Sequence, residues 1–463
     1  MNQNWIPVGY LLAAISFILA LKLMKSPVTA RHGNWLAAGG MFIAIALTFF
    51  DEGIARENFG WIIGAILVGA ALSILPSRSV PMTGMPQMVA LLNGLGGGAV
   101  ALVSLVEFIR QSSIGADWPI VPLVTTVLSA IIGCISFAGS LIAFGKLQEV
   151  LPSRAIVFPG QKAVNLVLLA SVAALAVLIV AGKPLVVLFA ALVVVSLIVG
   201  VSIVIPIGGA DMPVVISLLN SFTGTAAGLA GFVLANTALL IGGGLVGASG
   251  LILTIEMCRA MNRSLENVIF GAFGAQSAAA GSLAEGKTVR NYSVEDAAII
   301  FSNADSVIIV PGYGMAVAQA QHVLKELMTK LQARGIDVKF AIHPVAGRMP
   351  GHMNVLLAEA DVPYELLYDL DDINTMFPET DVALVVGAND VVNPAARSDP
   401  SSQIYGMPIL DVDKAKTCIV IKRSMNTGFA GIENELFYLP NTVMVFGDAK
   451  GVIAKLNTAI DSY

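Results

Sequence analysis

Charged residues are scarce in this chain of 463 residues. Asp, Glu, Lys and Arg together make up only 12% of it, whereas soluble domains contain about 25%. Hydrophobic residues account for 56%, the mean hydropathy is +0.81, and most of the apolar excess precedes residue 260. This composition excludes an ordinary soluble protein and predicts a large membrane domain.

Cysteine is also rare, and its distribution excludes several kinds of site. Cys134, Cys258 and Cys418 lie far apart and form no metal-binding or redox pattern. The lack of a disulfide framework suits a protein that faces the cytosol. The net charge of −5 gives no reason to expect nucleic-acid binding. We therefore expect neither a metal site nor a nucleic-acid partner.

Lysine and arginine do not precede the first apolar run, since Met1–Pro7 contains neither. That run is predicted to be a retained membrane helix and not a cleaved signal. A membrane helix needs about 20 mostly apolar residues. The sequence contains nine candidate spans, at 6–24, 34–50, 60–75, 86–106, 119–144, 164–181, 185–205, 213–235 and 238–258.

Loop charges predict the orientation of these helices, because Lys and Arg favour cytoplasmic loops. With the N-terminus outside, the inner loops carry nine basic residues, Lys146 among them, and the outer loops carry three. The odd number of spans then places everything after residue 260 in the cytoplasm. Histidine is missing from the spans, because His32 is assigned to a loop and the other three lie in the soluble part.

Three regions are expected: a membrane domain over 1–260, a linker rich in small residues over 261–290, and a soluble domain over 291–463. Strand–helix alternation in the last region predicts a doubly wound, Rossmann-like α/β domain with a parallel sheet. The predicted strands are Ser306–Val310, Val338–Ile342, Tyr364–Leu367, Val382–Val386, Cys418–Ile421 and Val443–Phe446. The predicted helices are Met315–Ala333, Met353–Ala360 and Lys450–Ile460.

A glycine-rich turn, Gly312-Tyr313-Gly314, follows the first predicted strand and opens a helix. Glycines permit close backbone approach to a pyrophosphate, and free N–H groups at the helix N-terminus attract the anion. Val317 replaces the third glycine of the usual fingerprint. The pattern predicts a dinucleotide site, and by itself leaves open a tight turn that binds nothing.

Three further loops follow predicted strands, where doubly wound sheets bind their ligands. After the second strand, the carboxylate that would favour NAD is missing and Arg348 suits a phosphate. After the fifth strand, Lys422, Arg423 and Ser424 would hold a phosphate monoester. After the fourth strand, Asp390 would bind a ribose or a carboxamide. Each loop also has an alternative interpretation without a ligand. Arg348 would be a surface arginine, the Lys422 loop a solvated basic strand end, and Asp390 a turn residue or helix cap.

Polar residues inside the predicted spans are few. Asn93 and Asn220 lie within helical runs, and Asp211 lies at the cytoplasmic mouth of the eighth span. Polar groups in hydrocarbon are costly and usually face a path or a partner. The alternatives are interhelical hydrogen bonds for the asparagines and a helix cap for Asp211, because Pro213 follows at an N1-like position.

Taken together, these residues closely resemble the β subunit of proton-translocating NAD(P) transhydrogenase. The resemblance covers essentially the whole chain. The runs that carry it most clearly are 208–215, 260–264, 312–321, 343–360 and 422–428. Long runs of this kind are far more specific than a single Gly-x-Gly motif.

The resemblance implies an enzyme subunit that is active only together with an α subunit. NADP(H) would bind the soluble domain of this chain in reversed orientation, and NAD(H) would bind the α subunit. Hydride would pass directly between the nucleotides without a catalytic acid or base, and inward proton movement would drive NADPH formation. A dimer of αβ units in the bacterial inner membrane is implied, with the N-terminus outside and the NADP domain in the cytoplasm.

The resemblance also implies the site residues. Those for the cofactor are Gly312, Tyr313, Gly314, Met315, Ala316, Val317, Val345, Ala346, Gly347, Arg348, Met349, Pro350, Gly351, Asn389, Asp390, Lys422, Arg423, Ser424, Met425, Asn426, Thr427, Gly428, Asp448 and Ala449. Those for the proton path and its coupling are Asn93, Asp211, Asn220 and Arg263.

Two positions depart from the family pattern. Asn93 stands where several bacterial members carry a histidine. We therefore expect a membrane histidine of the partner subunit to handle the proton, with Asn93 holding water. Phe429 stands where some relatives have tyrosine, a change that should be tolerated.

Two other classes of function share part of this layout. A transporter or channel gated by a cytosolic nucleotide-binding domain should show a selectivity element or symmetric broken helices, and neither is evident. A structural anchor with an inactive nucleotide fold would not need the glycine turn and the basic loop together.

Overall fold

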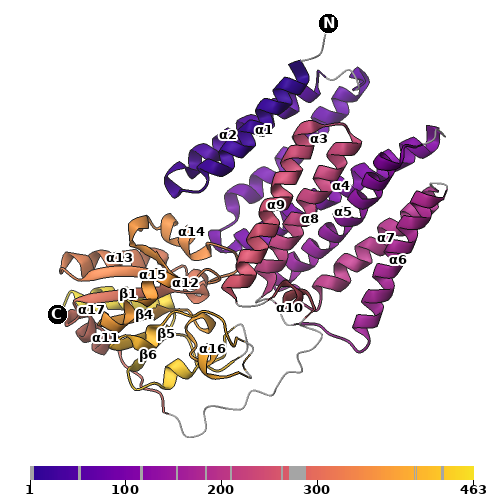
Figure 1. Ribbon diagram of the computed structural model, residues 1–463. Coiled ribbons are helices and arrows are strands. Elements are labelled where there is room, and N and C mark those ends of the chain that lie inside the picture. The colour runs from indigo at the N-terminus through magenta and orange to yellow at the C-terminus, as the bar shows by residue number, and fades with distance from the viewer. Residues whose placement is uncertain are drawn as a thin grey trace. The chain divides into compact units, whose positions relative to one another are not determined.

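The structure is a computed structural model, and two compact units make up the chain (Figure 1). One unit comprises Met1–Ile207 and Val215–Thr254, and the other comprises Gly208–Val214 and Ile255–Tyr463. The residues that the structure describes are 5–50, 54–114, 118–152, 155–182, 185–208, 211–261, 264–270, 288–400, 402, 404–428 and 432–462.

The first unit consists of long apolar helices. Over the described residues they are α1 (Trp5–Leu23), α2 (Pro27–Thr48), α3 (Phe59–Ser79), α4 (Met85–Ile114), α5 (Ile120–Leu147), α6 (Gln161–Ala181), α7 (Val186–Val204), α8 (Met212–Val233) and α9 (Thr237–Ala260). Eight helical segments in this part of the chain are long and apolar enough to cross a membrane. Each of the nine predicted spans overlaps one helix, and α2 is the one that falls outside the eight.

Several helices extend beyond the predicted spans, α2, α4 and α5 among them. The prediction that His32 lies in a loop is wrong, because α2 begins at Pro27 and includes it. Helix α4 continues to Ile114 and takes in Glu107, which is 7% exposed and pairs with Arg110 at 2.8 Å. Helix α5 continues to Leu147, so Lys146 is helical and not a loop residue. The apolar run thus ends where a charged or polar residue appears, whereas the backbone helix continues past it.

Glycine allows the helices of the first unit to approach closely. On α4 and α5, a methyl group on Gly97 would lie 3.0 Å from the Gly133 carbonyl oxygen, and one on Gly133 would lie 2.9 Å from the Gly97 oxygen. On α8 and α9, a methyl group on Gly243 would lie 2.3 Å from the Gly228 nitrogen. Small residues at such crossings are typical of membrane helices, which pack by close van der Waals contact.

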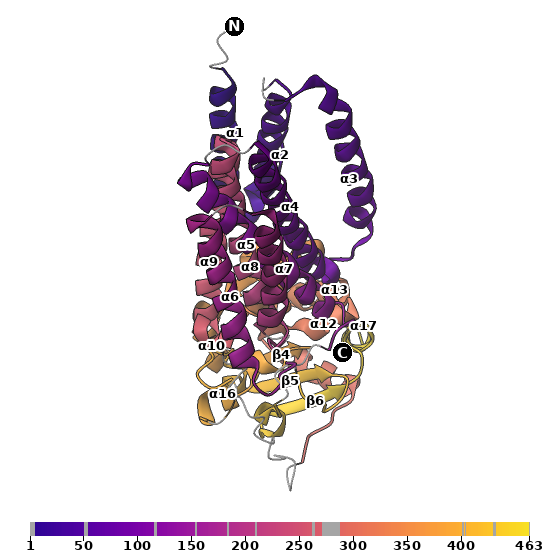
Figure 2. The same cartoon turned by 90° about the vertical axis from the view of Figure 1, so that its right-hand side faces the viewer.

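The second unit contains a parallel sheet of six strands in the order β3-β2-β1-β4-β5-β6. Its strands are β1 (Ser306–Pro311), β2 (Asp337–Ile342), β3 (Leu367–Asp369), β4 (Val382–Val386), β5 (Thr417–Lys422) and β6 (Thr442–Phe446). Strands β4, β5 and β6 are labelled side by side in Figures 1 and 2. Over the described residues of this unit, the helices of five or more residues are α10 (Leu265–Phe270), α11 (Val294–Ser302), α12 (Tyr313–Ala318), α13 (Gln321–Ala333), α14 (His352–Glu359), α15 (Leu370–Asn374) and α17 (Ala449–Ile460). The predicted doubly wound, Rossmann-like fold is confirmed.

Local details differ from the prediction. The continuous helix Met315–Ala333 is wrong, because Gln319 adopts φ +51° and separates α12 from α13. The third predicted strand begins too early, since Tyr364–Leu366 is a 3₁₀ turn that precedes β3. Helix α11 was not predicted, although Ser293 and Asp296 form a capping box at its start.

Burial explains why the strands were the clearest signal. All five residues of β4 are buried, and so are four of the six in β5. A strand that is covered on both faces has a nearly continuous apolar sequence. On one face the core joins Phe377, Leu410 and Leu436 to the central strands. This packing holds the parallel strands in place, so the loops that follow them lie at one edge of the sheet.

Candidate functional site

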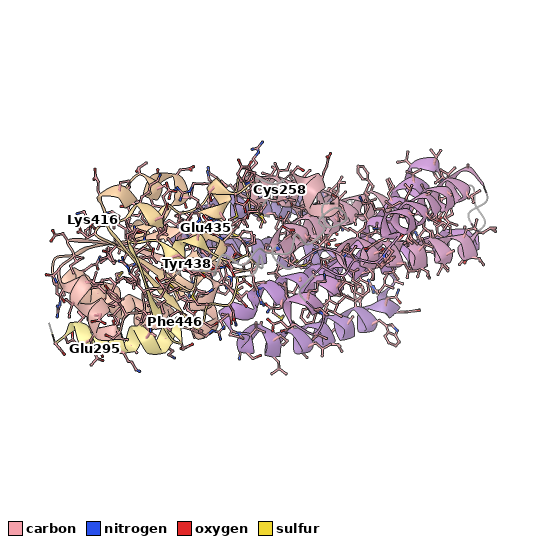
Figure 3. All side chains as sticks on the ribbon, turned by 90° about the horizontal axis from the view of Figure 1, so that it is seen from below. Cys258, Glu295, Lys416, Glu435, Tyr438 and Phe446 are labelled. Carbon is pink, nitrogen blue, oxygen red and sulfur yellow. The ribbon has the colours of Figure 1, made fainter. Side chains whose placement is uncertain are left out.

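A pocket of about 450 Å³ lies where β1, β4, β5 and β6 end. Parallel strands bring their carboxyl ends to one edge of a sheet, so loops far apart in sequence meet there. The residues that line it are Gly314, Val317, Ala318, Gly387, Ala388, Asn389, Ile421, Lys422, Arg423, Ser424, Asn426, Thr427, Gly428, Gly447, Asp448 and Ala449. The opposite edge is marked by Lys416, just before β5, whereas Phe446 ends β6 at the pocket edge (Figure 3).

The pocket brings together most of the predicted basic loop and parts of three other predicted segments. Among the described residues, the predicted positions that do not line it are Gly312, Tyr313, Met315, Ala316, the loop Val345–Gly351, Asp390 and Met425. Ala318, Gly387, Ala388, Ile421 and Gly447 line it without having been predicted. They carry no functional group, so only their position after a strand would have indicated them.

The glycine turn after β1 packs against the loop after β4. A methyl group on Gly314 would lie 2.7 Å from the Cα of Gly387, and one on Gly312 would lie 2.3 Å from the Cα of Ala388. Gly387 itself adopts φ +67°, a conformation that favours glycine. The backbone N–H groups of Gly312 and Gly314 donate to the carbonyls of Val386 and Gly387. These glycines are therefore required for contact between two loops, whatever ligand approaches them.

The basic loop after β5 carries two cations in different environments, since Lys422 is half-buried and Arg423 is exposed. Lys422 Nζ donates to the Asn426 carbonyl and lies 4.9 Å from the ring centre of Phe437. Burial lowers the pKa of Lys422, and the nearby Asp390 carboxylate acts in the opposite direction. Arg423 and Ser424 are exposed, so both are accessible to a ligand. A guanidinium and a hydroxyl on one loop suit the oxygens of a phosphate.

The loop after β4 is held by amide side chains. Asn389 Nδ2 donates to Asp390 Oδ1 at 3.0 Å, and Asn434 Nδ2 donates to the Asn389 carbonyl at 2.9 Å. Gly428 packs against this pair. Asp390 therefore orders the pocket wall through Asn389.

The predicted loop Val345–Gly351 forms a separate cluster with the glycine turn. The guanidinium of Arg348 lies 4.4 Å from the ring centre of Tyr313, and its backbone N–H donates to His352 Nδ1 at 3.0 Å. His352 is fully buried, and burial together with the Arg348 charge lowers its pKa to about 4. Gly347 has φ +106°, and a methyl group there would lie 2.5 Å from His352 Nδ1.

A second buried histidine, His343, was not predicted as a site residue. Its Nδ1 accepts from the Val345 N–H at 3.2 Å, so its Nε2 donates to the Pro408 carbonyl at 2.7 Å. Burial lowers its pKa to about 4, although the hydrogen bond to Pro408 acts against this shift. The neutral ring thus connects the end of β2 to the segment before β5.

The predicted membrane residues are distributed over several segments. Asn93 in α4 is 8% exposed and donates to Ser140 Oγ at 2.9 Å. Asn220 is half-buried in α8. The N–H of Asp211 donates to the Gly208 carbonyl at 3.2 Å, just before α8 begins. Arg263 and Phe429 lie outside the described residues.

A second cavity of about 440 Å³ in the same unit has a different character. Its cation is Arg397, which is paired with Asp411 at 3.1 Å and with Asp413 at 2.6 Å. The positive charge is thus already compensated by two carboxylates. The pocket at the carboxyl ends of the strands is the better candidate for an anionic ligand, because Arg423 there is exposed.

The residues of that pocket fit a dinucleotide with an additional phosphate. Close glycine contacts bring the loops after β1 and β4 together, and Lys422, Arg423 and Ser424 supply two cations and a hydroxyl. At the end of β2, where a carboxylate would select NAD, the structure places the buried, hydrogen-bonded His343.

Comparisons with known proteins identify relatives of this chain. The family model described as NAD(P) transhydrogenase beta subunit matches residues 6–459. The chain is 48% identical over 467 residues to NAD(P) transhydrogenase subunit beta of Rhodospirillum rubrum, and the match covers 100% of both chains. A second sequence from Rhodospirillum rubrum, under the same name, is equally similar.

Proposed function

The chain belongs to the NAD(P) transhydrogenase beta subunit family, and on that premise we propose that it is the NADP(H)-binding subunit of a proton-translocating transhydrogenase. Its apolar helices and its family make it an integral membrane protein. The soluble region 291–463 would hold the nucleotide in the cytoplasm, region 1–260 would conduct protons, and 261–290 would link them.

The observation that carries this proposal is the basic loop at the pocket. Arg423 and Ser424 are exposed beside Lys422, whose pKa is lowered by burial. A 2′-phosphate distinguishes NADP from NAD, and a guanidinium binds phosphate oxygens through two parallel hydrogen bonds. The loops around Gly312–Val317, Asn389 and Asp448 would bind the remainder of the nucleotide.

The residues of the pocket bind and orient, and none is needed as an acid or a base. When bound, the nucleotide supplies the ring that accepts a hydride from NADH on the α subunit. Arg423, Lys422 and Ser424 would fix one end of the ligand. Asn389, held by Asp390 and Asn434, would keep the pocket wall in place.

Proton coupling would act through the affinity for NADP(H). Two binding sites that influence each other do so reciprocally, so proton binding that weakens NADPH binding is itself weakened to the same extent by bound NADPH. Asn93, with its hydrogen bond to Ser140, would hold water on the path. Asp211, Asn220 and Arg263 would transmit the change, and a histidine of the partner subunit would carry the proton.

The proposal is tested by calorimetry on the purified full-length chain without its partner. NADPH should bind, whereas NADH at equal concentration should give no measurable heat. Arg423→Ala should weaken NADPH binding by about 10- to 100-fold, because charged hydrogen bonds are worth about 1.5–3 kcal/mol. Lys455→Ala, which removes an exposed cation from α17 outside the pocket, should have no effect.

Equal affinity for NADPH and NADH would contradict the assignment of the 2′-phosphate site. So would an Arg423→Ala variant that binds NADPH as tightly as the Lys455→Ala control.

A further inference from the structure

Lys146 is a lysine with an almost fully buried side chain, and the reaction proposed above does not use it. It lies in the last turn of α5 and is 1% exposed. Its Nζ donates to the carbonyl of Ile205 at 2.5 Å and to that of Ile207 at 2.7 Å. Lys162, at the start of α6, is exposed in contrast. Burying an ammonium group costs several kcal/mol unless hydrogen bonds compensate it.

The two carbonyls that Lys146 binds lie at the end of α7 and in the turn that follows. Helix α7 ends at Val204, with Ile205 as its C-cap. The last carbonyls of a helix lack intrahelical partners and carry partial negative charge. A cation from a neighbouring helix supplies both the missing hydrogen-bond donor and a compensating positive charge. The Ile205 carbonyl also accepts from the Ile156 N–H at 3.4 Å, so three segments meet at this turn.

This turn is the point at which the chain leaves the first unit. Ile207 is the last residue of that unit before Gly208–Val214, which belongs to the second unit. Asp211, the proposed coupling residue, follows within that segment, and its N–H donates to the Gly208 carbonyl. Only three residues separate Ile207 from Asp211 in the sequence.

The same end of α5 is joined to the proposed proton path on α4. Gln87 Nε2 donates to the carbonyl of Leu147, next to Lys146, at 3.2 Å. Asn93, six residues after Gln87 on α4, donates to Ser140, seven residues before Leu147 on α5, which places the two contacts about 9–10 Å apart along the helices. Within the described part of the chain, Gln87 Oε1 and Asn93 Oδ1 are buried without a hydrogen-bond partner, which suits ordered water.

We propose that Lys146 is a positioning residue for proton coupling, an inference that rests on the function proposed above. Its ammonium ties the end of α5, where α4 also bonds, to the Ile205–Ile207 turn that leads to Asp211. A shift of α5 against α4 then moves that turn, because the two charged hydrogen bonds hold it. Without the ammonium, the turn and the path move independently.

The test uses the complex of this chain with its partner subunit, reconstituted into lipid vesicles that contain a pH-sensitive dye. Two rates are measured: proton uptake driven by NADPH and an NAD analogue, and hydride exchange between NADH and that analogue. The exchange leaves the nucleotide on this chain bound, so it requires no change in affinity. The variants are Lys146→Met, Lys146→Gln and Lys146→Arg, with Lys162→Met as the exposed control.

Lys146→Met should lower proton uptake at least tenfold while hydride exchange stays within twofold of wild type. Lys146→Arg should restore at least half of the uptake, because a guanidinium also donates to both carbonyls. Lys162→Met should match wild type. If Lys146→Met does not assemble, Lys146→Gln is judged by the same two rates, since it keeps a donor without the charge.

Unchanged proton uptake in Lys146→Met would overturn the proposal. So would parallel loss of both rates in every Lys146 variant, Arg included, since Lys146 would then serve folding alone. A wild-type complex that exchanges hydride but moves no protons would overturn the proposed function, and the role of Lys146 with it.

Discussion

Gly428 packs directly against Asn389, although 38 residues of sequence separate them. A methyl group on Gly428 would lie 2.2 Å from Asn389 Nδ2 and 2.7 Å from Asp390 Oδ1. The amide cannot turn aside freely, because its Nδ2 donates to Asp390 and its Oδ1 accepts from Asn434 at 3.4 Å. The loops after β4 and β5 can therefore approach this closely only because Gly428 has no side chain.

We predict that Gly428→Ala weakens NADPH binding by about tenfold, because the added methyl group separates these loops or breaks the Asn389–Asp390 bond. Gly451→Ala is the matched control, since a methyl group at that helical position meets nothing within 4 Å. Calorimetric titration of both full-length variants with NADPH measures the difference. Equal affinities would show that the close contact does not determine the shape of the site.

Asp381 should support the sheet without affecting the ligand. Its carboxylate accepts from Lys416 at 2.7 Å and from the N–H groups of Asp305 and Ser306 at 2.9 and 3.0 Å, at the edge opposite the pocket. The Lys416 hydrogen bond is the main cause that lowers the pKa of Asp381 to about 2. Asp381→Asn should destabilise the soluble unit by about 1–3 kcal/mol, with NADPH affinity unchanged at low temperature.

Proteolysis of the soluble unit at increasing temperature, followed by mass spectrometry, measures this loss. The depressed carboxyl pKa also fixes the sign of the pH dependence. The stabilisation from Asp381 is present above pH 4 and disappears as the pH falls toward 2. An Asp381→Asn variant with wild-type resistance to protease, or with weakened NADPH binding, would contradict this division between the two edges.

The two buried histidines should make the soluble unit sensitive to mild acid. Burial lowers the pKa of both His343 and His352 to about 4, from an ordinary value of 6.5. Between these two pKa values the unfolded chain binds more protons than the folded chain. The free energy of unfolding is therefore unaffected by the histidines above pH 6.5 and falls as the pH drops toward 4. The expected slope is about 1.4 kcal/mol per pH unit for each histidine.

Hydrogen exchange of β2 and α14, corrected for the intrinsic rate at each pH, measures this slope. His343→Gln should remove about half of it, whereas His322→Gln, at an exposed position of α13, should leave it unchanged. A profile that is flat between pH 7 and 5 would show that neither ring resists protonation in the folded protein.

Asn93 and Ser140 should act as a pair in proton movement. Asn93 Nδ2 donates to Ser140 Oγ, and both side chains are buried between α4 and α5. Asn93→Ala and Ser140→Ala should each lower NADPH-driven proton uptake in vesicles. The double variant should be no slower than the worse single one, because contacting residues are not additive. Ser113→Ala, at an exposed position of α4, is the control. If the two substitutions lowered the rate of proton uptake by independent factors that multiply in the double variant, the two residues would not act as a pair.

Sequence reasoning placed the strands well and the helix ends less well. Buried runs such as Val382–Val386 are strong signals because both faces of the sheet are covered. Helix ends depend on contacts that have no local pattern. Lys146 lies in the last turn of α5, where its ammonium donates to carbonyls of the turn after α7, a contact that the local sequence does not indicate. The local sequence favours one helix over Met315–Ala333, but the left-handed backbone conformation of Gln319 ends α12 before α13 begins.

The sequence by itself determined the membrane character, the Rossmann-like sheet, the family and the identity of the basic loop. Those features depend on composition, on periodicity and on long runs of particular residues. Only the tertiary structure decided which loops meet. It set Gly314 against Gly387 and Gly428 against Asn389, and it placed the Arg348 guanidinium over the ring of Tyr313. The reason is that such contacts follow from strand order and close packing, which bring together residues that no spacing in the sequence relates.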